Sequence, residues 1–105
     1  MQEPSYILKN ETTGINGERI ILYYFTSESK ENLQNKAYGI GIDMYTQDYG
    51  MRTTRERKII DSVFLDKRDA EKFLNIICKC CVTPTSLADV IYDHISELPS
   101  GKNAI

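Results

Sequence analysis

The chain has 105 residues, of which 41% are hydrophobic and 27% are charged, with a net charge of −2 at pH 7. This length and composition predict a single folded domain and exclude an intrinsically disordered chain. The slightly acidic balance argues against general binding to nucleic acids or anionic membranes, and no apolar run approaches the roughly 18 residues that a transmembrane helix needs.

The N-terminus and the cysteines both favour a cytoplasmic protein. Residues 1–10, MQEPSYILKN, have neither the basic region nor the apolar core of a secretory signal peptide. The three cysteines are odd in number and clustered as CKCC at residues 78–81, which makes them a poor disulfide framework. We therefore expect reduced thiols and a cytoplasmic location.

The first part of the chain predicts strands. Residues 18–27, ERIILYYFTS, are rich in β-branched and aromatic side chains, as strands are. A turn-like segment with two glycines, TGING at 13–17, directly precedes them and suits a hairpin. The sequence leaves open whether residues 5–12 form the strand on the other side of that turn.

Two more extended segments follow along the chain. The polar residues 27–36 predict a loop, and residues 36–46, KAYGIGIDMYT, predict the next strand. A turn around Gly50 then leads into a last strand at 52–65. Because sequential strands with short connections pair antiparallel, we expect a meander of three or four strands.

After residue 65 the apolar residues recur with the period of a helix. Asp66 is a candidate N-cap for the first helix. The apolar stripe of this helix consists of Ala70, Phe73, Leu74, Ile77, Cys78 and Cys81. Thr83 and Pro84 suit the N-cap and the first position of a second helix. The stripe of the second helix consists of Leu87, Val90, Ile91, His94, Ile95 and Leu98.

These elements together predict an α+β fold, in which an antiparallel three- to four-stranded β-meander is followed by a helical hairpin packed on one face. We expect residues 1–98 to form this single domain and residues 99–105 to be a flexible C-terminal tail. No internal repeat or low-complexity segment interrupts the domain.

The predicted sheet carries apolar residues on both of its faces. In residues 20–25, large apolar side chains alternate with one another and not with polar ones. In the next strand Ile40 and Ile42 share one face, which we place under the helices, whereas Gly39 and Gly41 share the other. Two helices shield only one face, so something else must cover the glycine face. We consider aromatic rings or the N-terminal segment of the same chain, a second protein, or a small ligand.

We favour a small interaction module that self-associates through this second face, which would make the protein a homodimer or the partner of an unidentified protein. The candidate interface residues are Tyr23, Tyr24, Phe25, Gly39 and Gly41. The intramolecular alternative, in which rings of the neighbouring strand fold across the glycines, requires no function.

A second hypothesis is the binding of single-stranded nucleic acid. The segment RTTRERK carries four cations, Arg52, Arg55, Arg57 and Lys58. Cations beside tyrosines suit phosphates and stacked bases. A charged, solvated edge strand that resists pairing explains the same residues without nucleic acid, and we rank it higher.

A third hypothesis is an enzyme that uses His94, the only histidine. His94 lies on an apolar stripe, and no set of acid, base and nucleophile can be recognised beside it. We therefore favour a non-enzymatic role, with no catalytic residue assigned.

The cysteines invite a redox or zinc interpretation, because Cys78 and Cys81 have C-x-x-C spacing. They stand at the end of a predicted helix, however, where the helix dipole disfavours a thiolate. Zinc needs about four ligands, and only Cys80 and His94 remain as further candidates. We expect Cys78 and Cys81 to pack in the core, and we expect no metal and no other cofactor.

About four-fifths of the chain resembles a family of short uncharacterised proteins from low-GC Gram-positive bacteria. The resemblance is carried by YYFT at 23–26, YGIGI at 38–42, IIDSVFLD at 59–66 and VTPTSLADVIYDHI at 82–95. The features it implies are parts of a fold, namely an aromatic strand, a glycine strand and a helix cap. It supplies no activity, cofactor or catalytic residue. The cysteine cluster is not part of the resemblance, which again favours packing.

Overall fold

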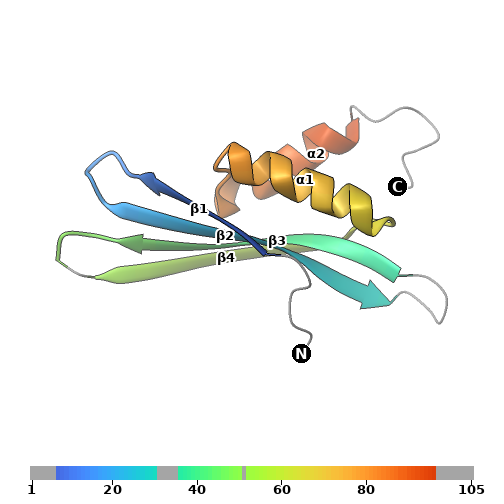
Figure 1. The fold of residues 1–105 in the computed structure, drawn as a ribbon, viewed down its shortest axis with the longest axis horizontal. Coiled ribbons are helices and arrows are strands. Elements are labelled where there is room, and N and C mark those ends of the chain that lie inside the picture. The colour runs from blue at the N-terminus through green and yellow to red at the C-terminus, as the bar shows by residue number, and fades with distance from the viewer. Residues whose placement is uncertain (1–6, 31–35, 51, 97–105) are drawn as a thin grey trace.

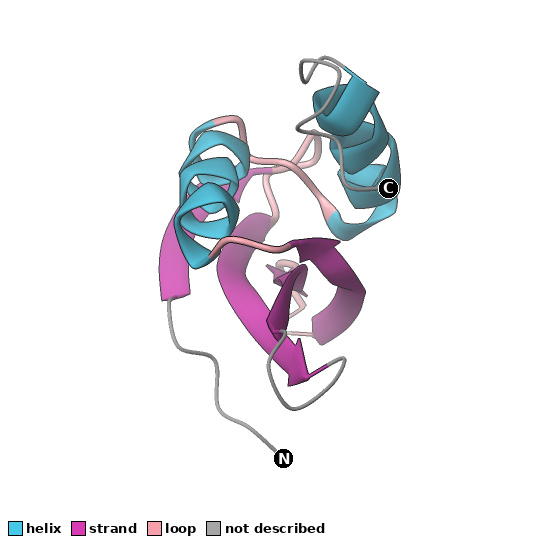
Figure 2. Ribbon diagram, turned by 90° about the vertical axis from the view of Figure 1, so that its right-hand side faces the viewer, coloured by secondary structure: helices cyan, strands magenta, loops and turns pink. Residues whose placement is uncertain are grey.

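The computed structural model describes residues 7–30, 36–50 and 52–96. A four-stranded antiparallel sheet is followed by two helices (Figure 1). The elements are β1 (Ile7–Thr13), β2 (Arg19–Lys30), β3 (Lys36–Gln47), β4 (Thr53–Phe64), α1 (Lys67–Lys79), a 3₁₀ turn (Pro84–Ser86) and α2 (Leu87–Ser96). The strand order is β1-β2-β3-β4, and both helices lie on one side of the sheet (Figure 2). The predicted α+β class is confirmed, in its four-stranded form.

The strand that the sequence left open is present as β1. The turn between β1 and β2 is closed by two backbone hydrogen bonds, from the Gly17 N–H to the Gly14 carbonyl at 3.0 Å and from the Gly14 N–H to the Glu18 carbonyl at 2.9 Å. Gly17 has a φ of +84°, which a residue without a Cβ adopts at little cost. This turn sets the register of the hairpin, in which Glu11 lies opposite Ile21.

The prediction of a loop from residue 27 onwards is wrong for its first part, because β2 continues to Lys30. Residues 28–30 pair with residues 36–38 of β3. The Glu28 carboxylate also forms an ion pair with Lys36 Nζ at 3.0 Å. Pairing with a neighbouring strand therefore outweighs the weak strand propensity of a polar segment. Residues 31–35 lie outside the described part of the chain.

The hydrophobic core lies between the sheet and the helices. Side chains alternate along each strand, so Leu22 and Tyr24 of β2 and Ile40 and Ile42 of β3 face the helices and are fully buried. The helices contribute Ala70, Phe73, Leu74, Ile77, Leu87 and Ile91. The placement of the Ile40 and Ile42 face under the helices is confirmed.

The ends of α1 show where capping was predicted well and where it was not. Asp66 is the N-cap, and its carboxylate accepts the Arg68 N–H at 2.8 Å. The expected helix to residue 81 is too long, since α1 ends at Lys79 and Cys81 adopts a left-handed φ of +51°. Hydrogen bonds from the Cys81 N–H to Cys78 O and from the Val82 N–H to Ile77 O close the helix as a Schellman motif.

The second helix begins through a 3₁₀ turn. Thr83 has the extended backbone of an N-cap, but its hydroxyl makes no capping hydrogen bond to the backbone. Leu87 and Ile91 are buried, whereas Val90, His94 and Ile95 are partly buried against the core. The expected burial of Leu98 and the expected tail at 99–105 fall on residues outside the described part of the chain.

The two glycines of β3 are packed closely by the chain itself. A Cβ on Gly41 would overlap the ring of Phe25 on β2. A Cβ on Gly39 would meet the backbone of β4, 2.5 Å from the Ile60 carbonyl oxygen and 2.8 Å from the Asp61 Cα. The missing side chains therefore make room for a ring at one position and for a neighbouring strand at the other.

These contacts predict an order of stabilities among glycine variants. We expect Gly39→Ala and Gly41→Ala each to lower the free energy of unfolding by about 1–3 kcal/mol through overpacking. Gly39→Ala should cost more, because strand backbone moves less readily than the Phe25 ring. Urea denaturation followed by circular dichroism measures the differences. Gly50→Ala, whose Cβ would have only a 3.4 Å neighbour, is the control, and equal midpoints for all three variants would contradict this packing.

Candidate functional site

The side of the sheet opposite the helices is not covered by any described helix or strand (Figure 2). We call this surface the open face. It consists of the side chains of the odd-numbered residues in β1, β2 and β3, and in β4 from Thr53 to Ile59, since partners across the sheet share a face. Its composition decides whether the sheet is finished or still has surface to offer.

Part of the open face is closed by rings and arginines of the chain itself. Arg57 lies over the ring of Phe25, with 5.2 Å from the guanidinium carbon to the ring centre, and Phe25 is only 5% exposed. Arg55 lies over Tyr45 at 5.7 Å. Cation–π contacts of this kind shield the rings while keeping the charges at the surface.

Asp43 holds both arginines in these positions. Its carboxylate accepts hydrogen bonds from Arg55 Nε at 3.2 Å and Nη2 at 3.3 Å, and it forms an ion pair with Arg57 Nε at 3.6 Å. The Asp43 side chain is 14% exposed, so this pairing is less screened than an ordinary surface ion pair. Both cations are therefore already partnered within the chain.

Beyond the arginines, the open face contains a hollow with a volume of about 400 Å³ that opens to solvent. Its lining consists of Ile21, Tyr23, Tyr45, Gln47 and Thr53. The two tyrosine rings meet edge to face with their centres 5.9 Å apart. The hydroxyls and the amide of this lining make no hydrogen bond within the described chain. The hollow thus combines an apolar wall with unpaired polar groups, as binding sites do.

The predicted interface residues divide between the two faces of the sheet. Tyr23 lines the hollow, and Phe25 lies on the open face above Gly41. Tyr24 faces the helices, is fully buried and donates its hydroxyl to the Val82 carbonyl at 2.9 Å, so its place among the surface candidates is corrected. Burial raises the pKa of Tyr24, with a smaller effect from Cys81. Ile21, Tyr45, Gln47 and Thr53 were missed, because strand register alone brings them together.

The basic segment does not form one stripe. Arg55 and Arg57 are on the open face, whereas Lys58 pairs with Ile42 and points to the other side of the sheet. Arg52 precedes β4 in the turn, where its backbone N–H donates to Asp48 Oδ1 at 3.0 Å. These cations therefore lie on both sides of the edge strand β4, and they do not form one row that the phosphates of a nucleic acid could follow.

His94 is a packing residue in this structure. Its ring lies 4.7 Å from the ring of Phe73 and 6.0 Å from that of Phe64, measured between ring centres. These contacts join α2 to α1 and to the end of β4. Their geometry is that of aromatic side chains in a core.

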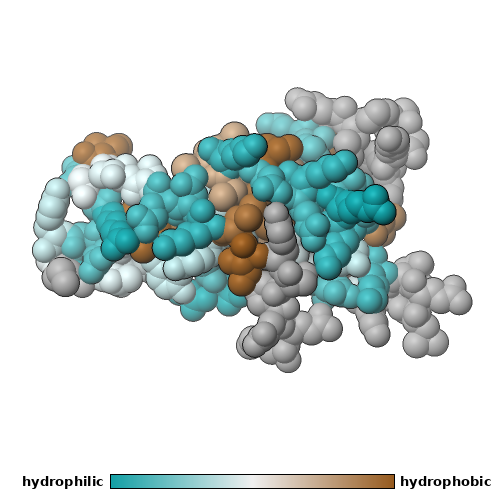
Figure 3. Space-filling view, in the orientation of Figure 1, coloured by the Kyte–Doolittle hydropathy of each residue, from teal (hydrophilic) through white to brown (hydrophobic). Residues whose placement is uncertain are grey.

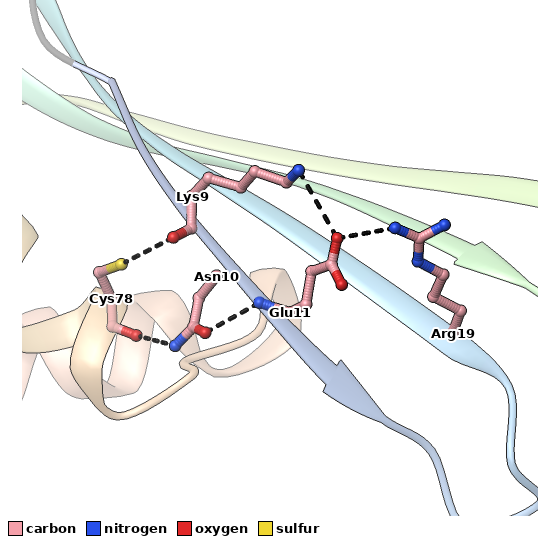
Figure 4. A network of polar contacts seen from close by, with 5 residues as sticks. All are labelled: Lys9, Asn10, Glu11, Arg19 and Cys78. Carbon is pink, nitrogen blue, oxygen red and sulfur yellow. Dashed lines mark hydrogen bonds and ion pairs between the residues drawn. The ribbon is translucent and has the colours of Figure 1, made fainter.

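Cys78 and Cys81 lie where the end of α1 meets β1, and Figure 4 shows Cys78 beside Lys9 and Asn10 of that strand. The Asn10 side-chain amide donates to the Cys78 carbonyl at 2.8 Å and to Cys81 Sγ at 3.1 Å. Burial, and to a lesser extent Cys81, raises the pKa of the Cys78 thiol, which opposes a reactive thiolate. All three cysteines are free thiols, and among the described residues no three potential metal ligands gather.

The same strand carries a surface ion-pair group on its open side (Figure 4). The Glu11 carboxylate accepts Arg19 Nη2 at 2.9 Å and lies 3.5 Å from Lys9 Nζ. The hydrogen bond from Arg19 lowers the pKa of Glu11. These residues are well exposed, so the group orients the hairpin and contributes little to stability.

Residues 5–97 match a family described as one of unknown function, DUF6514. The chain belongs to the DUF6514 family. No curated protein and no solved structure matches this DUF6514 chain. Within the described part of the chain, neither helix has the length and apolar character needed to cross a membrane. The family assignment adds no activity, so the open face is the basis for a functional proposal.

The contact between Asn10 and the cysteines predicts a sensitive position. We expect Asn10→Asp to lower the free energy of unfolding by about 1–3 kcal/mol, because a carboxylate would face an acceptor carbonyl in place of a donor. Asn10→Ala, which removes the donor without adding a charge, should cost less. Urea denaturation of both variants measures the difference. An Asp variant as stable as the wild type would mean that this hydrogen bond is not formed.

Thiol labelling provides a separate check of the cysteine environment. At neutral pH we expect iodoacetamide to modify exposed Cys80 at least about tenfold faster than Cys78, whose thiol is partly buried and whose pKa is raised. Peptide mass spectrometry over a time course gives the two rates. The control is the protein in denaturant, where the rates should converge. Faster labelling of Cys78 in the folded protein would rule out this arrangement.

Proposed function

We propose that this DUF6514 chain is a protein-interaction module that self-associates through the open face of its sheet. The observation that carries the proposal is the hollow between Tyr23 and Tyr45, an open apolar site on the only sheet face without a described covering element. Hot-spot residues of protein interfaces are often aromatic and line pockets from which a partner displaces water.

The neighbouring row of the open face supports the same proposal. Ile7, Phe25, Gly41 and Ile59 lie side by side across the four strands. Phe25 is buried, but Ile7 is 55% exposed and Ile59 is 38% exposed. Exposed apolar side chains at both edges of one row extend the surface that a partner would cover. The centre of the proposed interface lies at the hollow, because the glycines are already filled by the chain.

The partner class follows from how the charges are arranged. A nucleic-acid surface needs cations that are free to meet phosphates, whereas Asp43 binds both Arg55 and Arg57. The tyrosines meet edge to face and leave the apolar depression open beside them, which suits a side chain better than a stack of bases. A protein surface is therefore the better complement to this face.

We also propose a cytoplasmic location. Three free thiols, one of them exposed on Cys80, support a reducing compartment. We propose a non-enzymatic role, because the lining of the hollow is a mixture of apolar, hydroxyl and amide groups. His94 packs against aromatic rings, which supports a structural role for that residue.

Self-association can be tested by sedimentation of the wild type and of two single variants, each of which lacks one tyrosine ring. Sedimentation velocity from about 10 µM to about 500 µM should show a concentration-dependent dimer, the range expected for an interface of modest area. We expect Tyr45→Ala to weaken the dimer at least about tenfold, as removal of a hot-spot ring does.

Tyr92→Ala is the matched control, because Tyr92 is 74% exposed on α2 and lies away from the sheet. It should leave the dimer unchanged. A wild-type chain that stays monomeric over the whole range would refute the proposal. Binding of a fluorescent single-stranded oligonucleotide that weakens steeply with salt would instead support the nucleic-acid hypothesis.

A further inference from the structure

We infer that the hollow is filled by the β1–β2 turn of a second copy, inserted through Ile15. This inference rests on the proposed self-association and adds the segment that makes the contact. Three features of the described residues support it: an apolar side chain without contacts, a hollow of matching chemistry, and opposite charges around the two.

Ile15 makes no packing contact with the described part of its own chain. It stands between Gly14 and Asn16 in the tight turn and is fully exposed, at 103% of the reference area. Figure 3 shows a hydrophobic patch on the β1–β2 turn, at the left end of the molecule, next to hydrophilic surface. Turns of this kind usually carry Asn, Asp, Gly or Ser, so a β-branched apolar residue there is unfavourable unless something covers it.

The hollow offers the complementary surface. Ile21 and the two tyrosine rings supply an apolar wall for an isoleucine side chain. At the rim, the Gln47 amide and the Thr53 hydroxyl have no hydrogen-bond partner within the described chain. Asn16, the neighbour of Ile15, has a side-chain amide that is equally unpaired, and two amides can exchange a donor and an acceptor.

The charges around the turn and the hollow are opposite. Residues 11–18 contain two glutamates and no cation, which gives them a net charge of −2. Residues 52–58 contain four cations and Glu56, which gives them a net charge of +3. Within these segments Glu11 is already paired with Arg19, and Arg55 and Arg57 are paired with Asp43. Glu56 and Lys58 lie on the other side of the sheet, opposite Met44 and Ile42. Glu18 and Arg52 therefore remain as the charges that an approaching second copy would bring together.

Ile15 does not enter the hollow of its own chain, because its side chain is fully exposed. The hollow extends along the strands away from the turn, since Gln47 pairs with Arg19 and Ile21 lies two residues further along β2. In a dimer whose two-fold axis runs parallel to the two open faces, each turn meets the partner's hollow. The contact then forms twice, and no surface complementary to it is left over to build a fibre.

The test uses two variants that are each defective in one half of the contact. Ile15→Asp removes the inserted side chain, and Tyr45→Glu removes the wall of the hollow while giving Arg55 a carboxylate in place of the ring. Each variant alone should dimerise at least about tenfold more weakly than the wild type in sedimentation velocity. Mixed together, they should form a heterodimer, because one intact turn meets one intact hollow. Native mass spectrometry with one variant labelled with ¹⁵N identifies it.

Ile76→Asp on α1, where the native residue is 49% exposed, is the matched control and should dimerise like the wild type. Circular dichroism of each variant checks that the fold is retained. If the Ile15→Asp variant still dimerises and the Tyr45→Glu variant does not, the inference is overturned and the proposed function stands. Loss of the dimer in both variants without recovery in the mixture would also overturn the inference. A monomeric wild type would overturn both.

Discussion

The structure depends on one constraint: the central strand β2 is apolar on both of its faces, so both sides of the sheet need shielding from water. Leu22 and Tyr24 are shielded by the helices. On the other side Phe25 has no helix above it, and it lies against the bare backbone of Gly41 beneath the guanidinium of Arg57. The chain therefore covers this second side with its own side chains. The cover here is a single layer, made of one aromatic ring and one arginine.

The cover on the open face is incomplete, and its limit defines the candidate site. It extends from Phe25 to Tyr45, held by the carboxylate of Asp43. Beyond Tyr45 the strands continue towards their turns, which project past the helices in Figure 1. The hollow lies where this cover ends. Ile21 and the rings of Tyr23 and Tyr45 form its apolar wall, and the polar groups of Gln47 and Thr53 have no hydrogen-bond partner in the described chain.

At the same level of the strands, the helix-facing side of the sheet serves a structural purpose. The side chain of Asn10 ties β1 to the last turn of α1, and Cys81 occupies the left-handed position that glycine usually takes in a helix-ending motif. Tyr24 reaches the same region through its hydroxyl. A sequence motif that suggests redox chemistry or zinc is thereby explained by the docking of an edge strand onto a helix end. In this chain Cys78 and Cys81 therefore belong to the helix side of the sheet, whereas the aromatic hollow lies on the open face.

The sequence by itself determined the fold class, the helix start at Asp66 and the face that Ile40 and Ile42 present to the helices, because these follow from local periodicity and capping. It also indicated an excess of apolar surface on β2 and a close approach to the glycine strand. Only the tertiary structure decided what makes that approach, since Phe25 and Gly41 meet through strand register. Register likewise moved Tyr24 into the core, extended β2 to Lys30 and brought Ile21, Tyr45 and Thr53 from three strands to one hollow. Pairing between distant segments has no local signature, and for that reason the site became visible only in the folded chain.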